Sequence, residues 1–236
     1  MIDFLRQVIH FYQDPANTFG THTAQFLTIC LYSIVLAMVI ALPLGVVASL
    51  QPVLAFAANN VTGLMRAVPP LVFFFLIIGV LHVGIFQTTI FALVVLGIPP
   101  ILLNTIAGIT GVEPGARDAA RGMGMTRWQQ LWRVELPLAF PIITAGIRIS
   151  AVQIIATATI AAVTGAGGYG DYLTEGINLL NNVAVVAGAL PVAVLALGAD
   201  LLLGAIQRWV TPRGILARTQ AEQEDVLSPS PVGAAA

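Results

Sequence analysis

Five long apolar stretches constrain this chain more than any other feature of its sequence, because each must be kept away from water. They lie at residues 26–50, 53–81, 88–109, 138–164 and 183–209. About 20 residues cross the roughly 30 Å hydrocarbon core of a bilayer as an α-helix, and each stretch reaches that length. Charged residues make up only 9% of the chain, too few to cover a water-exposed surface. The sequence therefore predicts an all-α polytopic membrane protein with five transmembrane helices.

The second apolar stretch carries Pro69 and Pro70 near its middle. Proline inside a helix removes a backbone hydrogen bond and crowds the preceding turn. We therefore expect a kinked or broken helix at this point. If the stretch forms two short spans instead of one, the chain crosses the membrane six times rather than five.

Arginine residues are unevenly distributed between the loops that connect the predicted spans. Segment 112–137 contains four of them, and Arg208, Arg213 and Arg218 follow the last span, whereas segment 165–182 contains none. Loops rich in arginine stay on the cytoplasmic side of a membrane. This pattern predicts that segment 112–137 and the C-terminus are cytoplasmic, and five crossings then place the N-terminus outside.

Three regions follow from this layout. Residues 1–22 are predicted to form a peripheral N-terminal segment, and residues 23–210 the transmembrane domain. Residues 211–236 combine an acidic cluster with Ser-Pro pairs and few large apolar side chains. Such a composition is typical of disorder, so a disordered cytoplasmic tail is expected there.

Several function classes are excluded by composition. All ten basic residues are arginine, and the phosphate-binding loop of P-loop ATPases needs a lysine, so the chain is not its own ATPase. Cys30 is the single cysteine, which excludes an internal disulfide. The three histidines are scattered, and no basic stripe points to nucleic acid. We expect no catalytic residues, no metal site and no cofactor on this chain.

Segment 112–137 is too polar to cross the membrane, yet its apolar residues recur at helical spacing. Trp128, Leu131 and Trp132 fall on one face of a short helix, with Glu135 next along that face. Gly124 interrupts the segment, which predicts a helix, a turn that ends in glycine, and a second helix.

The C-terminal end of segment 112–137 and the surface that the segment would lie against can also be inferred from the sequence. Pro137 is expected to mark the restart of helix as the fourth span begins. An amphipathic hairpin of this kind fits a position flat on the lipid headgroups as well as a surface that docks a protein partner. Periodicity leaves both alternatives open.

A longer motif separates them. Asp118-Ala119-Ala120 is followed after three residues by Gly124, and nine further residues lead to Val134 and then to Leu136-Pro137. This motif resembles the Glu-Ala-Ala loop of ABC-importer permeases, with the family spacing reproduced in full. Asp118 replaces the family's glutamate and Val134 its isoleucine.

The resemblance implies the type I ABC importer permease fold. In that family the loop forms a coupling helix that sits in a groove of a cytoplasmic ATPase, so ATP is bound by a separate ATPase dimer and not by the permease. Carried over to this chain, the ATPase-coupling residues are Asp118, Ala119, Ala120, Gly124, Trp128, Val134, Leu136 and Pro137.

Neighbouring residues narrow the resemblance. Glu113-Pro114-Gly115, the run at residues 157–162 and the glycine-rich run that ends at Asp171 look like the osmoprotectant-uptake permeases. These permeases import glycine betaine, choline, carnitine or proline compounds. The resemblance implies an inner-membrane protein that works with a second permease subunit, identical or paralogous, and with an extracytoplasmic substrate-binding protein.

Candidate residues for the solute pathway come from polar or irregular positions in and beside the spans. A charge that faces lipid costs several kcal/mol, so Arg66 and Arg148 are expected to face a cavity, the bundle interior or an interface. Asp200 lies two turns before Arg208 and can pair with it. The glycine-rich run fits either a flexible external link or a gating segment at the outer mouth. The pathway and gate candidates are Arg66, Pro69, Pro70, Thr157, Thr159, Gly165, Gly167, Gly168 and Gly170.

Two other function classes remain as alternatives. An ion-gradient-driven secondary transporter or channel needs ionisable groups at mid-membrane and commonly has inverted repeats. A membrane anchor subunit of a redox enzyme complex needs histidines that face each other within spans. The sparse carboxylates and the positions of the histidines favour neither.

Overall fold

The computed structural model describes residues 2–81, 84–161 and 165–210, and within these ranges the chain is helical and contains no strand. This result confirms the all-α prediction. The elements in chain order are α1 (Ile2–Gln13), η1 (Pro15–Asn17), α2 (Phe19–Ser49), α3 (Pro52–Ala67), α4 (Pro70–Leu81), α5 (Ile85–Thr110), α6 (Pro114–Gly122), α7 (Arg127–Gln130), η2 (Leu131–Glu135), α8 (Leu136–Ala161), α9 (Tyr169–Asn178) and α10 (Asn182–Val210).

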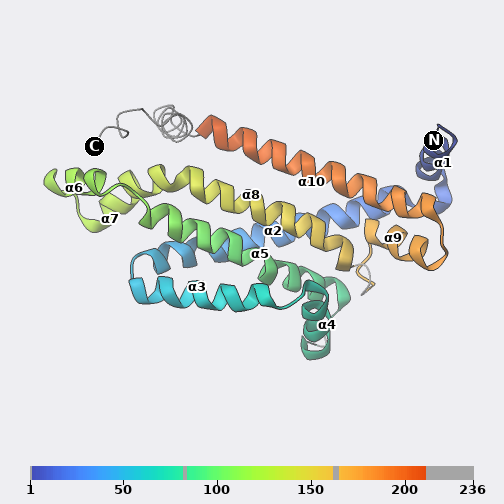
Figure 1. Cartoon of the computed structure of the whole chain (residues 1–236), viewed down its shortest axis with the longest axis horizontal. Helices are drawn as coiled ribbons and strands as arrows, with labels where there is room; N and C mark the ends of the chain where they lie inside the picture. The colour runs from blue at the N-terminus through green and yellow to red at the C-terminus, as the bar shows by residue number, and fades with distance from the viewer. Residues whose placement is uncertain (1, 82–83, 162–164, 211–236) are drawn as a thin grey trace, which may run out of the picture.

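Four long apolar helices run side by side along the molecule and form its body (Figure 1). They are α2, α5, the continuous helix from Arg127 to Ala161, and α10. Helices α3 and α4 together form a fifth candidate span, bent by 97° at its break. The structure therefore has four to five spans, in agreement with the prediction when the bent pair counts as one. The predicted end of the fourth span, at residues 162–164, lies outside the described residues.

The break between α3 and α4 lies at the predicted proline pair. Val68 precedes Pro69 and has an extended backbone (ψ 122°), which is the conformation that a following proline enforces. Pro70 then begins α4, where a missing N–H costs nothing. The predicted broken helix is thus confirmed.

Helix α5 is the centre of the bundle. Its apolar window is 61% buried, against 17% for α10, because α5 packs against both α2 and α8. Small residues allow this close approach. A side chain at Gly45 would begin 2.6 Å from Thr105, and one at Gly146 would begin 2.5 Å from Asn104. The Ser150 hydroxyl adds a hydrogen bond of 2.8 Å to the carbonyl of Gly97.

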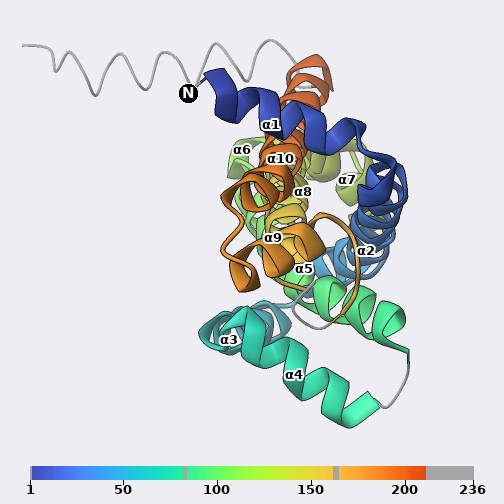
Figure 2. The same ribbon diagram turned by 90° about the vertical axis from the view of Figure 1, so that its right-hand side faces the viewer.

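The two ends of the bundle differ. Helices α6 and α7 lie at the same end as the C-terminal end of α10, and α1 and α9 lie at the opposite end (Figure 1). Figure 2 shows α1 lying across that opposite end. The Tyr12 hydroxyl donates a 3.0 Å hydrogen bond to the carbonyl of Ala187 in α10, which fastens α1 there.

Candidate functional site

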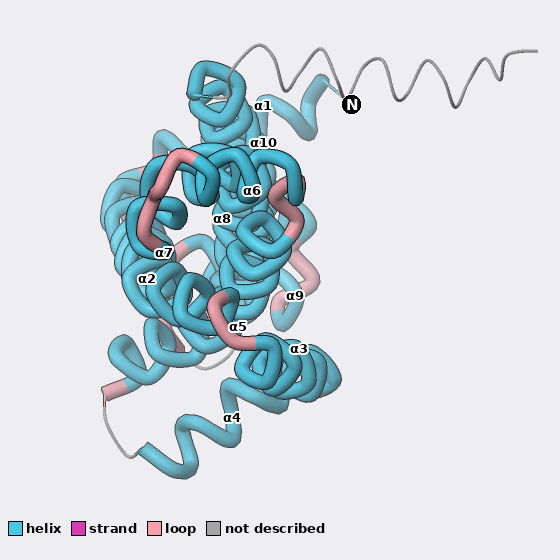
Figure 3. Tube along the Cα trace, turned by 90° about the vertical axis from the view of Figure 1, so that its left-hand side faces the viewer, coloured by secondary structure: helices cyan, strands magenta, loops and turns pink. Residues whose placement is uncertain are grey.

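The α6–α7 hairpin brings together the residues that the sequence predicts for coupling; Figure 3 views the molecule from this end. Helix α6 begins at Pro114 and packs against η2. Its small residue Ala120 is buried, with only 1% of its surface exposed. Asp118 and Arg121 point outward, with side chains 71% and 59% exposed and 3.6 Å apart. An exposed pair of this kind contributes at most about 1 kcal/mol, so both charges remain available to a partner.

The turn between the helices is specified by its hydrogen bonds. The N–H of Met125 donates to the carbonyl of Ala120 (3.1 Å) and that of Gly124 to Arg121 (2.9 Å), the pattern of a Schellman motif. Gly124 has φ +74°, a left-handed conformation that favours glycine. Met123, at the tip, is 69% exposed. The predicted helix, glycine turn and helix are therefore present.

The second helix of the hairpin starts with a capping box. The N–H of Gln129 donates to the Thr126 hydroxyl (3.3 Å), and the N–H of Thr126 donates to the side-chain oxygen of Gln129 (2.9 Å). Two backbone donors that a helix start leaves unpaired are satisfied in this way. The hairpin tip is thus fixed on both sides of the turn.

The junction with α8 corrects part of the prediction for Pro137. Pro137 is the second residue of α8, as predicted, but no break precedes α8, because one helix runs from Arg127 to Ala161. Its irregularity is the π-helical turn η2, in which the N–H of Leu136 donates to the carbonyl of Leu131. Pro137 has no N–H for the carbonyl of Arg133 and its ring would crowd that carbonyl, so a wider turn relieves the conflict. The hairpin is therefore joined to the following span by continuous helix.

An ion pair fastens the two arms of the hairpin at its root. Arg117 Nε lies 3.2 Å from Glu135 Oε1, with side chains 26% and 13% exposed, and Gln130 donates to the same oxygen at 3.0 Å. Arg117 also donates to the carbonyls of Ile109 and Thr110 at the end of α5, where a cation is favourable. Sequence reasoning missed this clamp, because the π turn that brings Gln130 and Glu135 together has no separate sequence signal.

The predicted apolar face of the second helix is divided in the structure. Leu131 is 1% exposed and packs with Ile109 and Ala139, whereas Trp128 and Trp132 are 62% and 55% exposed. The two indole rings meet edge to face at 5.7 Å. They line an apolar groove of about 640 Å³ along α2. Tryptophan is enriched where membrane proteins cross from lipid to water.

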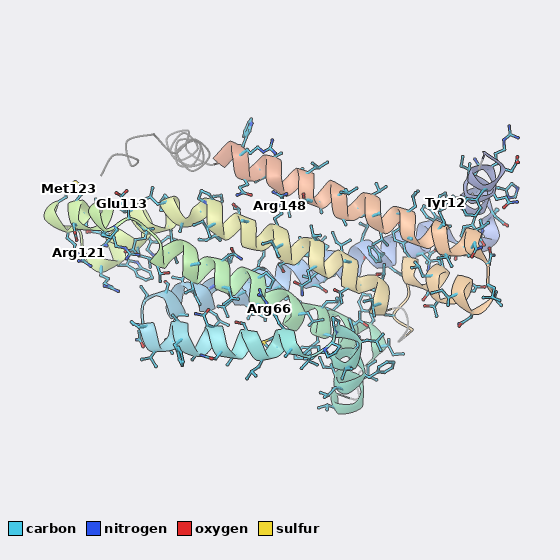
Figure 4. All side chains as sticks on the ribbon, in the orientation of Figure 1. Tyr12, Arg66, Glu113, Arg121, Met123 and Arg148 are labelled. Atoms are coloured by element: carbon cyan, nitrogen blue, oxygen red, sulfur yellow. The ribbon has the colours of Figure 1, made fainter. Side chains whose placement is uncertain are left out.

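The hairpin therefore has two parts of different character. Its root has an apolar groove with tryptophan at the edge, and its tip carries exposed polar and small groups beyond the bundle. Figure 4 labels Glu113, Arg121 and Met123 at this extremity. Of the predicted coupling residues, Asp118, Ala119, Gly124, Trp128 and Pro137 are exposed, Val134 and Leu136 are half-buried, and Ala120 is buried.

The predicted pathway residues do not form one cluster. Arg66 is exposed on α3, on the opposite side of the bundle from α10 (Figures 1 and 4). Thr157 is buried and its hydroxyl donates to the carbonyl of Gln153 (2.7 Å), while the Thr159 hydroxyl donates to that of Ala156. Both hydroxyls thus bond within α8.

The glycine-rich run is packed rather than loose. Gly165, Gly167 and Gly168 have φ values of +81°, +83° and +83°. The N–H of Gly168 faces Gln25 at 3.4 Å, and a side chain on Gly168 would begin 3.2 Å from Phe26. The run therefore contacts the first turns of α2.

Helix α9, which follows the run, is held by polar contacts. The Tyr169 hydroxyl donates to the hydroxyl of Thr23 in α2 (2.9 Å), and the Tyr172 hydroxyl donates to the carbonyl of Asn17. Burial raises the pKa of Asp171, which His22 at 3.5 Å partly opposes. Burial also raises the pKa of Tyr172 to about 12. This end of the bundle is a compact cap.

Comparison with known proteins agrees with this architecture. Residues 33–213 match the family described as binding-protein-dependent transport system inner membrane component. The carnitine transport permease protein OpuCB of Listeria monocytogenes is 38% identical over 208 residues, which cover 88% of this chain and 95% of that protein. The glycine betaine/carnitine/choline transport system permease protein OpuCB of Bacillus subtilis is 37% identical over 211 residues, covering 89% and 97%.

Solved structures share the fold. The MetNI methionine ABC transporter, in an inward-facing conformation, contains a chain that superposes with a TM-score of 0.74 at 21% identity, covering 82% of this chain and 96% of that one. The family match spans most of the sequence. It favours the ABC permease over the two alternatives, an ion-gradient-driven transporter or channel and a membrane anchor subunit. The chain therefore belongs to the family of binding-protein-dependent transport system inner membrane components, and it is the multi-pass inner-membrane permease subunit of an ABC importer, not an enzyme, with ATP hydrolysis on a separate subunit.

Proposed function

We propose that this permease forms the translocation pathway for compatible solutes such as glycine betaine, choline, carnitine or proline. The relatives named above transport carnitine, glycine betaine and choline, and they align over almost their entire lengths. The pathway would be built by two permease subunits, identical or paralogous, in the lipid bilayer. An extracytoplasmic binding protein would deliver the solute, and a cytoplasmic ATPase dimer would bind the ATP, with no cofactor on this chain.

The proposed orientation places the hairpin and the C-terminus in the cytoplasm and the N-terminus outside. Four arginines in segment 112–137 support it through the positive-inside rule. The hairpin also lies at the same end as the C-terminal end of α10, as one cytoplasmic side requires (Figure 1). In this layout residues 1–22 are peripheral, residues 23–210 form the membrane domain and residues 211–236 are a cytoplasmic tail.

The outer mouth would then be formed by the broken span and the glycine-rich run. Arg66, Pro69 and Pro70 lie at the bend between α3 and α4, and Gly165 to Gly170 lead into the α9 cap. Irregular backbone at membrane depth is tolerated only against protein or a water-filled cavity. Both segments, with Thr157 and Thr159 below them in α8, remain our candidates for gating.

The central proposal is that the α6–α7 hairpin couples the membrane spans to the ATPase. The observation that carries it is mechanical: an exposed tip is joined through the Arg117–Glu135 clamp and a continuous helix to α8. A push on Met123 or Asp118 at the tip would therefore move the span without first bending a flexible linker. The coupling residues are the exposed Asp118, Ala119, Gly124 and Trp128, the buried Ala120, and Val134, Leu136 and Pro137 at the root.

Gly124→Val tests the coupling role. Valine at φ +74° costs roughly 1–2 kcal/mol, so the turn should rearrange while the bundle stays folded. We expect the reconstituted importer to lose both solute uptake and solute-stimulated ATP hydrolysis. Gly122→Val is the matched control, because Gly122 is exposed, helical and open around its β position. Normal coupled transport by Gly124→Val would exclude the proposed role.

A further inference from the structure

A bidentate ion pair connects α8 and α10 inside the membrane-spanning part of the bundle. Arg148 donates through Nη2 to Asp200 Oδ2 at 2.7 Å and through Nε to Oδ1. Arg148 is twelve residues beyond Leu136, the start of α8, which is about 18 Å along a helix axis. The hydrocarbon core is about 30 Å thick, so the pair lies at its depth. The sequence interpretation that Asp200 pairs with Arg208 is wrong.

The pair is not buried within this chain. The side chains of Arg148 and Asp200 are 39% and 33% exposed. Figure 4 shows Arg148 between α8 and α10, about midway along the bundle. A charge that faces lipid at this depth costs several kcal/mol. This face must therefore meet water or protein when the importer is assembled.

The ion pair lines an open depression of about 470 Å³ on this face. A volume of this size is within the range of small-molecule sites. One face of α8 supplies most of the lining, with Gln153 as a further polar side chain. Gly204 of α10 faces the guanidinium, since a side chain there would begin 3.3 Å from Arg148 Nη1. The other lining residues are Ala145, Ile149, Val152 and Ala156.

We propose that the Arg148–Asp200 pair is a binding site for zwitterionic solutes on the translocation pathway, facing the second permease subunit. The inference rests on the proposed function. A solute with a carboxylate and a quaternary ammonium carries the same two charges as the pair. Its carboxylate can take the planar fork of Arg148, which binds carboxylates bidentately, and its cation then faces the released Asp200.

This exchange would also affect the helices. The ion pair is a side-chain bond between α8 and α10, and Gln207 provides a second by donating to the carbonyl of Pro141 (2.9 Å). A solute that replaces one partner of the ion pair removes that bond only while it is bound. The separation of α8 from α10 would thereby depend on the presence of solute.

The test compares a zwitterion with a cation. Uptake of glycine betaine and of choline is measured for the complete importer, with its binding protein unchanged, in proteoliposomes. Arg148→Gln leaves Asp200 unpaired, which favours the cation. The ratio of choline uptake to glycine betaine uptake should therefore rise by roughly fivefold or more. Asp200→Asn leaves Arg148 unpaired, so the ratio should shift in the opposite direction. Gln207→Leu, which removes an uncharged bond between the same helices, should leave the ratio unchanged.

Two outcomes would overturn the inference in different ways. If both charge variants lower uptake of the two solutes in proportion, as Gln207→Leu would, the pair is only a bond between helices. If the unaltered importer takes up neither solute, the proposed substrate class fails and this site fails with it. Purified yield of each variant separates a folding defect from a change in selectivity.

Discussion

Arg117 and Glu135 show how single side chains determine the geometry of the hairpin. Glu135 accepts from Gln130 and pairs with Arg117, and Arg117 in turn donates to the last carbonyls of α5. The two arms of the hairpin therefore meet at the carboxylate of Glu135, and Arg117 connects them to the preceding span. The Asp118–Arg121 pair, in contrast, lies within α6 and is exposed, so it contributes little to the geometry of the hairpin.

Glu135→Ala should loosen the hairpin without unfolding the bundle. The change leaves the amide of Gln130 without its acceptor and the partly buried guanidinium of Arg117 without its counter-charge, a cost of about 1–3 kcal/mol. Backbone amides of α6 and α7 should then exchange with deuterium roughly tenfold faster in the intact importer.

Asp118→Ala is the matched control for this measurement. It removes an equivalent charge from the same hairpin, but its partner is exposed and the pair is worth little. Exchange in α6 and α7 should stay within error of the unaltered protein. Equal protection in the Glu135 and Asp118 variants would show that the clamp does not hold the hairpin.

At the scale of helices, close packing at small residues decides where the spans meet. α5 approaches α8 at Gly146, where an added side chain would begin 2.5 Å from the β carbon of Asn104 and 2.8 Å from the carbonyl of Pro100. One of these neighbours is backbone and cannot rotate away. The crossing therefore depends on the absence of a side chain.

Gly146→Val should push α5 and α8 apart. Overfilled cores lose typically about 1–3 kcal/mol, which should lower the melting temperature of the detergent-solubilised importer. Gly198→Val is the control, since no atom lies within 4 Å of its β position in α10. A melting temperature equal to that of the control would show that the α5–α8 contact adjusts without cost.

The prolines show how far sequence reasoning reaches for these elements. Pro69-Pro70 correctly predicts the break between α3 and α4, because two consecutive prolines follow a residue forced into extended backbone. Pro137 lies in the first turn of α8 as predicted, but its conflict with the preceding turn is relieved by a π turn and not by a break. The length of an apolar stretch predicts a span, and a glycine predicts a turn. A local change of hydrogen-bond pattern inside a helix, such as the π turn, depends on packing and is not predicted.

For the whole molecule, the sequence predicts the order of the spans but not their neighbours. Segment lengths and the loop motif lead to the correct fold, because a bilayer leaves few alternatives. The partner of Asp200 is different: Arg148 is 52 residues away and becomes adjacent only when α8 and α10 pack. By contrast, the sequence predicts the hairpin and the N-terminus on opposite sides of the membrane, and in the structure the hairpin and the α1–α9 cap lie at opposite ends (Figure 1).

The central claim, that the hairpin tip contacts a separate ATPase, is tested most directly by site-specific cross-linking in the assembled importer. Met123→Cys and Leu180→Cys, both in a Cys30→Ala background, place one thiol at the tip and one at the opposite end, where the native side chains are 69% and 88% exposed. Each thiol is labelled with benzophenone and irradiated. The account predicts that Met123→Cys links to the ATPase subunit and that Leu180→Cys does not; a link from Leu180→Cys, or none from Met123→Cys in an importer that still transports, would contradict it.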